Sequence, residues 1–299
     1  MDDYLIRALT TNKELRALAV KSTHVVAEAQ RRHQTTPAAT AALGRVLSGA
    51  LLTGSLVKSG EEILLEVEGD GPAGKIIAES NQQGDVRGYI SNPELALFTT
   101  DDGKLDVARA VGRGQLSLTK FMSMKEPYKG SVPLVSGEIG DDLTYYFTAS
   151  EQIPSAVGLG VLVDKDLSVK AAGGFLIQLL PDASEETIQL LENNLKKVKS
   201  VSALIDKGMS PEDILDRILG ELEYKVVARK NVNFKCKCSR DRSYELIMGL
   251  GRHEIEETLK EQGELEVRCH FCSQNYTFNN DEVKKMLEEL DKENTAEED

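Results

Sequence analysis

The four cysteines of the chain stand in two close pairs, Cys236-Lys237-Cys238 and Cys269-His270-Phe271-Cys272, and none precedes position 236. Zinc in proteins favours four sulfur ligands, each about 2.3 Å from the metal, at the corners of a tetrahedron. A C-x-x-C turn places two thiolates on one side of a hairpin knuckle, and an extended C-x-C directs residues i and i+2 to the same face. The spacing therefore predicts one Zn²⁺ held by Cys236, Cys238, Cys269 and Cys272.

Two alternatives accompany this prediction. Four unrelated buried thiols would be scattered along the chain instead of paired, so the pattern favours a metal site. His270 lies inside the knuckle and could replace a cysteine as ligand, but with four thiolates available it is expected to be a solvated neighbour.

The site also has redox chemistry open to it. Thiolates are the form of cysteine that oxidants attack, and their oxidation to disulfides removes the ligands of the metal. The segments around the cysteines contain few apolar residues, and structural zinc sites supply on the order of 10 kcal/mol of folding energy. Oxidation would therefore unfold this part of the chain. From these residues alone, a purely structural zinc ribbon and a redox switch both remain open.

No other pattern predicts catalysis. The loop from Gly69 to Lys75 satisfies both G-x-G-x-x-G and G-x-x-x-x-G-K, but an alternating, strand-like segment follows it where a phosphate-binding loop requires a helix. A hairpin turn is the better interpretation. His24 and His33 have no accompanying nucleophile motif, and His253-Glu254 fits a charged helix face. We expect no enzyme here.

The amino-acid composition disfavours several other classes of function. The chain has 299 residues, 40 % of them hydrophobic, no Trp and a formal net charge of −13. Such a charge disfavours binding to nucleic acid or to an anionic membrane surface. Residues 38–57 are apolar, but Arg45 near their centre favours a packed helix over a bilayer span. The N-terminus lacks the basic start and apolar run of a signal peptide, so we expect a cytoplasmic protein with reduced thiols.

Periodicity divides the chain into regions of different kinds. Thr36-Pro37 predicts the start of a helix, and from Glu61 short alternating strands follow one another. Strands are expected at residues 4–9, 63–68, 75–79, 86–90, 115–120, 144–148, 158–164 and 173–180. The predicted fold class is α+β, with mixed strands and helices over residues 1–181.

The remainder reads as three further segments. Residues 182–230 predict a metastable linker of short amphipathic helices beginning at Ser184 and Ser210, which depend on docking for stability. Residues 231–290 predict the zinc-binding domain, with strands at 232–237 and 264–268 around helices at 240–248 and 252–262. Residues 291–299 predict a disordered acidic tail.

Several further stretches stand in order along almost the whole chain: the Gly69-Asp70-Gly71-Pro72-Ala73-Gly74 turn, Tyr128-Lys129-Gly130, Gly137-Glu138-Ile139, Ser150-Glu151-Gln152-Ile153-Pro154-Ser155-Ala156 and Ala172-Gly173-Gly174-Phe175-Leu176-Ile177-Gln178. Together with the cysteine pairs, they resemble the bacterial 33 kDa heat-shock chaperonin family of redox-regulated holdases.

This resemblance implies a molecular chaperone that is inactive while reduced and zinc-bound. Oxidative stress, usually with heat, would form the Cys236–Cys238 and Cys269–Cys272 disulfides and expel the zinc. The zinc domain and linker would then unfold, and the protein, a homodimer in its active form, would bind unfolding client proteins without ATP. The alternative from another class is a constitutive zinc-ribbon adaptor for a protein or nucleic acid, whose binding would need zinc and would be lost on oxidation.

Overall fold

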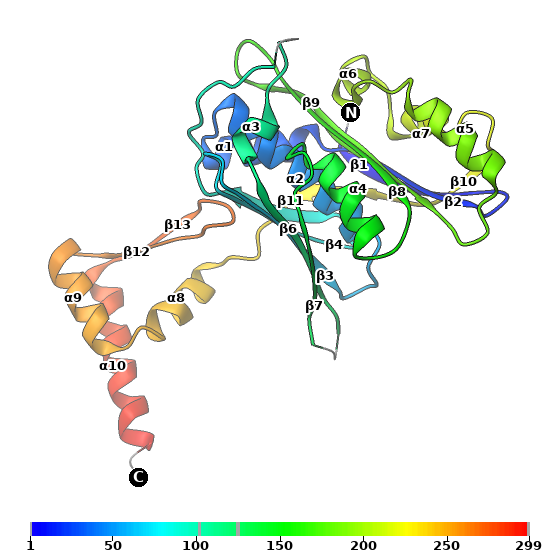
Figure 1. The fold of residues 1–299 in the computed structure, drawn as a ribbon. Coiled ribbons are helices and arrows are strands. Elements are labelled where there is room, and N and C mark those ends of the chain that lie inside the picture. Colours follow the sequence, from blue (N-terminus) through cyan, green and yellow to red (C-terminus); the bar gives the residue numbers. More distant parts are fainter. Residues whose placement is uncertain (1, 101–102, 124–125, 298–299) are drawn as a thin grey trace. The chain divides into compact units, whose positions relative to one another are not determined.

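The computed structural model describes residues 2–100, 103–123 and 126–297, and the side chains as far as residue 291. Contacts divide the chain into two compact units, the first ending at Lys235 and the second beginning at Cys236. The first unit contains two β-sheets with helices, and the second contains a two-stranded sheet with three helices (Figure 1). The predicted fold class, α+β, is confirmed.

Sheet A of the first unit has five strands in the order β10-β1-β2-β9-β8, all antiparallel to their neighbours. Its strands are β1 (Tyr4–Thr10), β2 (Leu15–Lys21), β8 (Ser155–Val163), β9 (Val169–Leu179) and β10 (Tyr224–Asn231). Both faces of the sheet are buried at β9, and the sequence of this strand is almost continuously apolar. A strand with this pattern needs cover on both sides.

Sheet B has six strands in the order β11-β5-β4-β3-β6-β7. Its strands are β3 (Glu62–Gly69), β4 (Lys75–Asn81), β5 (Asp85–Ile90), β6 (Gly114–Phe121), β7 (Tyr128–Pro133) and β11 (Asn233–Phe234). The short helix α3 (Val107–Val111) precedes β6. Alternating burial along β3 and β5 directs one face of this sheet toward the core.

Helix α2 (Pro37–Gly54) packs against strands of both sheets, together with α1 (Thr23–His33). Pro37 occupies the first turn after an extended Thr36, as the sequence predicted. Almost every residue of α2 is buried, and Arg45 pairs with Glu138. The packed helix predicted for this segment is confirmed. Among the described residues, no helix combines the length and apolar character that crossing a bilayer requires.

Three helices cover the other face of sheet A: α5 (Glu185–Leu195), α6 (Val201–Asp206) and α7 (Pro211–Leu219) (Figure 1). Each begins at a serine whose side chain accepts a backbone N–H three residues further on. Their apolar sides join the sheet in one buried cluster, whose helical members are Leu191, Val201, Ile205, Ile214, Leu215, Ile218 and Leu219. No cysteine contributes to either core cluster of this unit.

Residues 182–230, predicted as a helical linker, contain these three helices and also β10. The strand was not expected, because its sequence holds several exposed, charged positions. It pairs with β1 in antiparallel register, with one irregularity between Arg7 and Ala8. The functional division between residues 1–181 and 182–230 remains a prediction.

Two regions of the first unit differ from the sequence-based expectation. Residues 144–148 were predicted as a strand, and this prediction is wrong, because they lie in helix α4 (Gly140–Ala149). The Asp142 carboxylate at its start accepts N–H bonds from Val135, Ser136, Gly137 and Ile139. These hydrogen bonds at the N-terminus of α4 and the burial of Tyr146 outweigh the preference of Thr, Tyr and Phe for strands.

The second difference concerns residues 1–34, for which only the first strand was predicted. They also contain β2 and α1. The Asp3 carboxylate accepts the Val25 N–H and contacts the His24 ring, so it anchors the start of α1. Burial raises the pKa of Asp3, while these hydrogen bonds oppose that shift.

The second unit contains α8 (Arg240–Met248), α9 (Arg252–Gln262), β12 (Leu265–Arg268), β13 (Asn275–Phe278) and α10 (Asn280–Glu297). The two helices expected between the cysteine pairs are confirmed, as is the strand before Cys269. Of the strand expected at residues 232–237, only residues 233–234 form a strand, β11, which pairs with β5. Helix α10 continues to Glu297 through most of the segment predicted as a disordered tail, since Glu and Lys favour helix; residues 298 and 299 lie outside the described ones.

Candidate metal centre

The four cysteine sulfurs lie together in the second unit, and each is within 4.8 Å of the others. The Sγ atoms of Cys236 and Cys269 are 3.7 Å apart, and those of Cys238 and Cys272 are 3.4 Å apart. Four sulfurs bound tetrahedrally at about 2.3 Å would be separated by about 3.8 Å. The spacing therefore matches the geometry of a single metal ion with four thiolate ligands.

A tight turn positions Cys269 and Cys272. The Ser273 N–H donates to the Cys269 carbonyl oxygen, and the Cys269 N–H donates to the Gln274 carbonyl oxygen. Ser273 has a φ of +56°, a left-handed conformation that closes the turn between β12 and β13. The backbone amides of Phe271 and Gln274 face the thiols of Cys269 and Cys272 respectively. The knuckle predicted from C-x-x-C is present.

Cys236 and Cys238 approach from a segment without regular structure that leads into α8. Ser239 ends this segment with an extended conformation, and its hydroxyl accepts the Arg242 N–H as the N-cap of the helix. The cap fixes where the helix begins, so Cys238 stays outside it. Both sulfurs of the C-x-C face the knuckle, as residues i and i+2 of an extended segment should.

The electrostatics of the cluster favour a bound cation. Burial, and next the neighbouring Cys236 thiol, raise the pKa of Cys269, while burial is the largest cause of the raised pKa of Cys272. The Tyr276 hydroxyl donates to the Cys238 Sγ at 3.3 Å, and this hydrogen bond is the main reason that its pKa rises to about 12. Thiols crowded in this way resist ionisation, and a metal ion supplies the positive charge that stabilises four thiolates.

The donor set also restricts which metals fit. Four soft thiolates in a tetrahedral arrangement suit zinc or iron and exclude calcium and magnesium, which take oxygen ligands. His270, the alternative ligand, is exposed and does not belong to the sulfur cluster. Over the described ranges, this is the one cluster of three or more His, Cys, Asp or Glu side chains close enough to share a metal ion.

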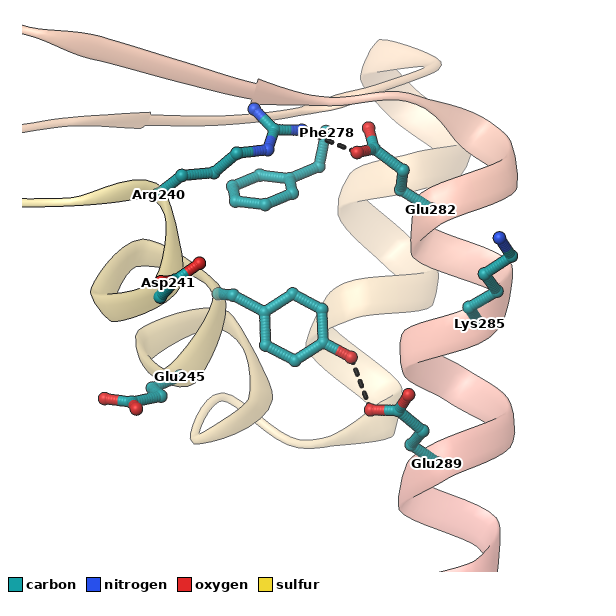
Figure 2. Close-up of a pocket in the computed structure, with 8 residues that line it drawn as sticks. Arg240, Asp241, Glu245, Phe278, Glu282, Lys285 and Glu289 are labelled. Carbon is teal, nitrogen blue, oxygen red and sulfur yellow. Dashed lines mark hydrogen bonds and ion pairs between the residues drawn. The ribbon is translucent and has the colours of Figure 1, made fainter.

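The second unit has a small core. Its fully buried apolar side chains are Ile247, Ile255, Leu265, Phe278, Val283 and Met286. Figure 2 shows how polar contacts supplement them: the Arg240 guanidinium lies over the Phe278 ring, 4.3 Å from its centroid, and pairs with Glu282 at 2.7 Å. The Tyr244 hydroxyl donates to Glu289. These contacts join α8, β13 and α10.

The other sequence-level candidates do not form sites. Residues 69–75 form the connection between β3 and β4, and the Gly71 N–H donates to the Val111 carbonyl oxygen. A Cβ at Gly69 would lie 2.0 Å from that same oxygen, so the glycines serve close backbone packing. The predicted hairpin turn is confirmed. His24 contacts Asp3, and His253 lies exposed 3.9 Å from Glu257.

The fold and the site together define a two-sheet α+β protein with a C-terminal unit whose four clustered cysteines could hold a metal ion. A model of the Hsp33 protein family matches residues 3–279, and the chain belongs to this family. The resemblance noted in the sequence is confirmed.

Individual relatives agree over nearly the full length. A protein of Bacillus cytotoxicus named 33 kDa chaperonin is 47 % identical over 291 residues, which cover 97 % of this chain and 100 % of that protein. The protein of the same name from Geobacillus kaustophilus is 46 % identical, with 98 % and 100 % covered. The crystal structure of the 33 kDa chaperonin (heat shock protein 33 homolog) of Thermotoga maritima matches with a TM-score of 0.90 and 37 % identity, covering 96 % and 98 %.

Proposed function

We propose that this protein is a redox-regulated, ATP-independent holdase chaperone, kept inactive by zinc while its thiols are reduced. The observation that carries the proposal is the cluster of four sulfurs within 4.8 Å of one another, in a unit that has only a small apolar core. Membership of the Hsp33 family and the chaperonin names of the relatives support a non-enzymatic, protein-binding role.

The metal would be one Zn²⁺ per chain, held by Cys236, Cys238, Cys269 and Cys272. Bound zinc would keep the four sulfurs as thiolates and join the start of α8 to the β12–β13 hairpin, a contribution of on the order of 10 kcal/mol to folding. The six buried apolar side chains of this unit would contribute less than a domain core normally does. The unit would therefore depend on its four thiolates for stability.

Oxidation would remove those ligands. Each pair of thiols that becomes a disulfide gives up two electrons and two protons, which one hydrogen peroxide molecule accepts as it becomes two molecules of water. We propose the pairs Cys236–Cys238 and Cys269–Cys272, each within one segment of chain. With four sulfurs in disulfides, no thiolate remains to bind the metal, and the unit loses the folding energy that the site supplied.

The linker helices α5–α7 would cover an apolar face of sheet A, and unfolding of the second unit would loosen them. Residues 220–235, which include β10 and β11, connect α7 to the first cysteine. The helices hide an apolar face of sheet A that includes Ile6, Leu15 and Ile177. Polar contacts hold them there: the Tyr4 hydroxyl donates to Glu212, and the Thr187 hydroxyl donates to Glu14. Undocking would expose apolar surface on the sheet and on the helices.

Such a surface would hold unfolding client proteins by burying apolar area, a process that requires no nucleotide. The hairpin turn at residues 69–75 is consistent with a chaperone that works without ATP. The active form would be a homodimer, residues 1–181 would carry client binding and dimer contacts, and the protein would work in the cytoplasm, where thiols are reduced in the absence of stress.

The direct test uses the full chain, reduced and loaded with zinc. Peroxide at elevated temperature should release one equivalent of zinc, protect the four thiols from alkylation and suppress aggregation of a thermally unfolding client, with and without ATP. Release of zinc without any effect on client aggregation would contradict the chaperone assignment. A protein that binds partners only in the reduced state would instead be an adaptor.

A further inference from the structure

We propose that the Tyr276 hydroxyl restrains the reactivity of the Cys238 sulfur and thereby sets how fast the C-x-C half of the site is oxidised. This role rests on the proposed redox function and adds to it a residue that controls the sensitivity of the switch. Tyr276 is not a ligand; it acts through Cys238.

The contact is well defined in the structure. The Tyr276 hydroxyl lies 3.3 Å from the Cys238 Sγ, within hydrogen-bonding distance for sulfur. Tyr276 is a residue of β13, opposite Val267 of β12, and its ring packs against the small core of the unit. The hairpin register therefore aims the hydroxyl at the cysteine that approaches from the other segment. A side chain held in this way is pre-organised to donate.

The chemistry of oxidation explains why such a donor slows the reaction. The sulfur lone pair attacks a peroxide oxygen, the S–O bond forms, the O–O bond breaks, and hydroxide leaves, giving a sulfenic acid. A second thiol then displaces that oxygen as water and completes the disulfide. Negative charge leaves the sulfur during the attack, so a hydrogen bond to the sulfur is stronger before the transition state than in it. The hydroxyl therefore stabilises the unreacted thiolate.

The two halves of the site differ in the origin of such donors. Cys269 and Cys272 face the backbone amides of Phe271 and Gln274, which remain in place when a side chain is changed to any residue other than proline. Cys238 receives its hydrogen bond from a side chain. The hydrogen bond to the C-x-C half can therefore be removed by deleting a single side-chain hydroxyl group.

The same unit offers a matched control. Tyr244 also has a hydroxyl that donates a hydrogen bond, but its acceptor is the Glu289 carboxylate instead of a sulfur. Tyr276→Phe and Tyr244→Phe each delete one oxygen atom and keep the ring in the core. Only the first removes a donor from the thiolate cluster, so a difference between them isolates the contact with Cys238 from general loss of stability.

The experiment compares wild type, Tyr276→Phe and Tyr244→Phe as reduced, zinc-loaded full chains under limiting peroxide. The rate of Cys238 modification is followed by mass spectrometry after alkylation, and zinc release is followed with a coloured chelator. Loss of about half of the strength of this charge-assisted hydrogen bond in the transition state predicts oxidation about 4- to 13-fold faster in Tyr276→Phe. Tyr244→Phe should stay within about 2-fold of wild type, because the hydroxyl that it deletes contacts a carboxylate and no sulfur.

A second variant distinguishes hydrogen bonding from packing. Replacing Tyr276 with 3-fluorotyrosine keeps the shape and strengthens the donor, so Cys238 should be oxidised more slowly than in wild type. Equal rates for wild type and Tyr276→Phe, or faster oxidation with the fluorinated residue, would overturn the inference while leaving the proposed function intact. Oxidised wild type that fails to hold clients would overturn the proposed function alone, and cysteines that resist peroxide would overturn both.

Discussion

Substitution of Leu215 by alanine should loosen the linker helices without any oxidation. Leu215 is fully buried on α7, in the cluster that joins the helices to sheet A. Truncation of a buried leucine to alanine costs about 2–5 kcal/mol, because apolar contacts are lost and a cavity remains. A cost of about 3 kcal/mol would raise the population of undocked helices by roughly 100-fold. The reduced variant should therefore expose part of the apolar face that we assign to client binding.

The assay has two parts. Suppression of client aggregation by reduced, zinc-loaded Leu215→Ala should exceed that of reduced wild type at equal concentration. Hydrogen exchange should accelerate over residues 211–219 and remain slow in β3 and β4 of sheet B, which distinguishes local undocking from global unfolding. Leu246→Ala is the matched control, since Leu246 of α8 is 67 % exposed and its truncation removes little burial.

Two results would refute this reasoning. If Leu215→Ala accelerates exchange over residues 211–219 but holds no more client than wild type under reducing conditions, the sheet face under the helices is not the client-binding surface. If exchange accelerates equally in sheet B, the substitution has destabilised the whole first unit, and α5–α7 do not form an independently releasable cover.

Three further predictions concern the site and the cover. Cys272→Ser should lower zinc affinity by at least 10-fold, since it removes one of four ligands, and should unfold the second unit alone; zinc stoichiometry and NMR dispersion would reveal a second unit that stays ordered without metal. Burial, and next the hydrogen bond to Glu212, raise the pKa of Tyr4 to about 12. Because a raised pKa favours the neutral phenol, the contribution of Tyr4 to helix docking is complete below the unfolded pKa of about 10 and is lost as pH rises through about 12. The difference between the absorbance titrations of wild type and Tyr4→Phe should give the midpoint of Tyr4 ionisation near pH 12. A midpoint near pH 10 would contradict this prediction. In Gly160→Ala, the new Cβ would lie 2.7 Å from the Ser202 backbone nitrogen of α6. The variant should therefore lose about 1–3 kcal/mol of docking stability, and hydrogen exchange over residues 201–206 should be faster. Unchanged exchange over these residues would show that α6 adapts at no cost.

The cysteine cluster was the most predictable part of the protein. Its four residues are chemically distinctive and their spacing restricts the geometry, so residue types alone placed them together. The knuckle turn at Ser273 and the cap at Ser239 could not be seen in that pattern, because they depend on backbone conformation. Nor could Tyr276: its hydroxyl reaches Cys238 only after the register of β12 and β13 is set. A tyrosine two residues into a strand carries no such signal by itself.

Elements of the first unit were predictable where local pattern and tertiary burial agree. Residues 37–54 read as a helix and form one, because Pro37 and the small apolar residues favour it on both counts. Residues 144–148 are of types that favour strands, but they lie in α4. The Asp142 carboxylate binds backbone N–H groups of the preceding turn and so fixes the start of this helix. Strand β10 was missed for a related reason: it is an edge strand, and only its pairing with β1 makes it one.

The distribution of cysteines has a consequence for the reversibility of the proposed redox switch. Neither core cluster of the first unit contains a cysteine, and all the thiols belong to the second unit. Oxidation of the thiols to disulfides would therefore form no new covalent bond within the two larger sheets, and disulfides are bonds that a cellular reductant can break. Once the stress has passed, reduction and a fresh metal ion would be enough to restore the starting state, with no need to synthesise the chain again.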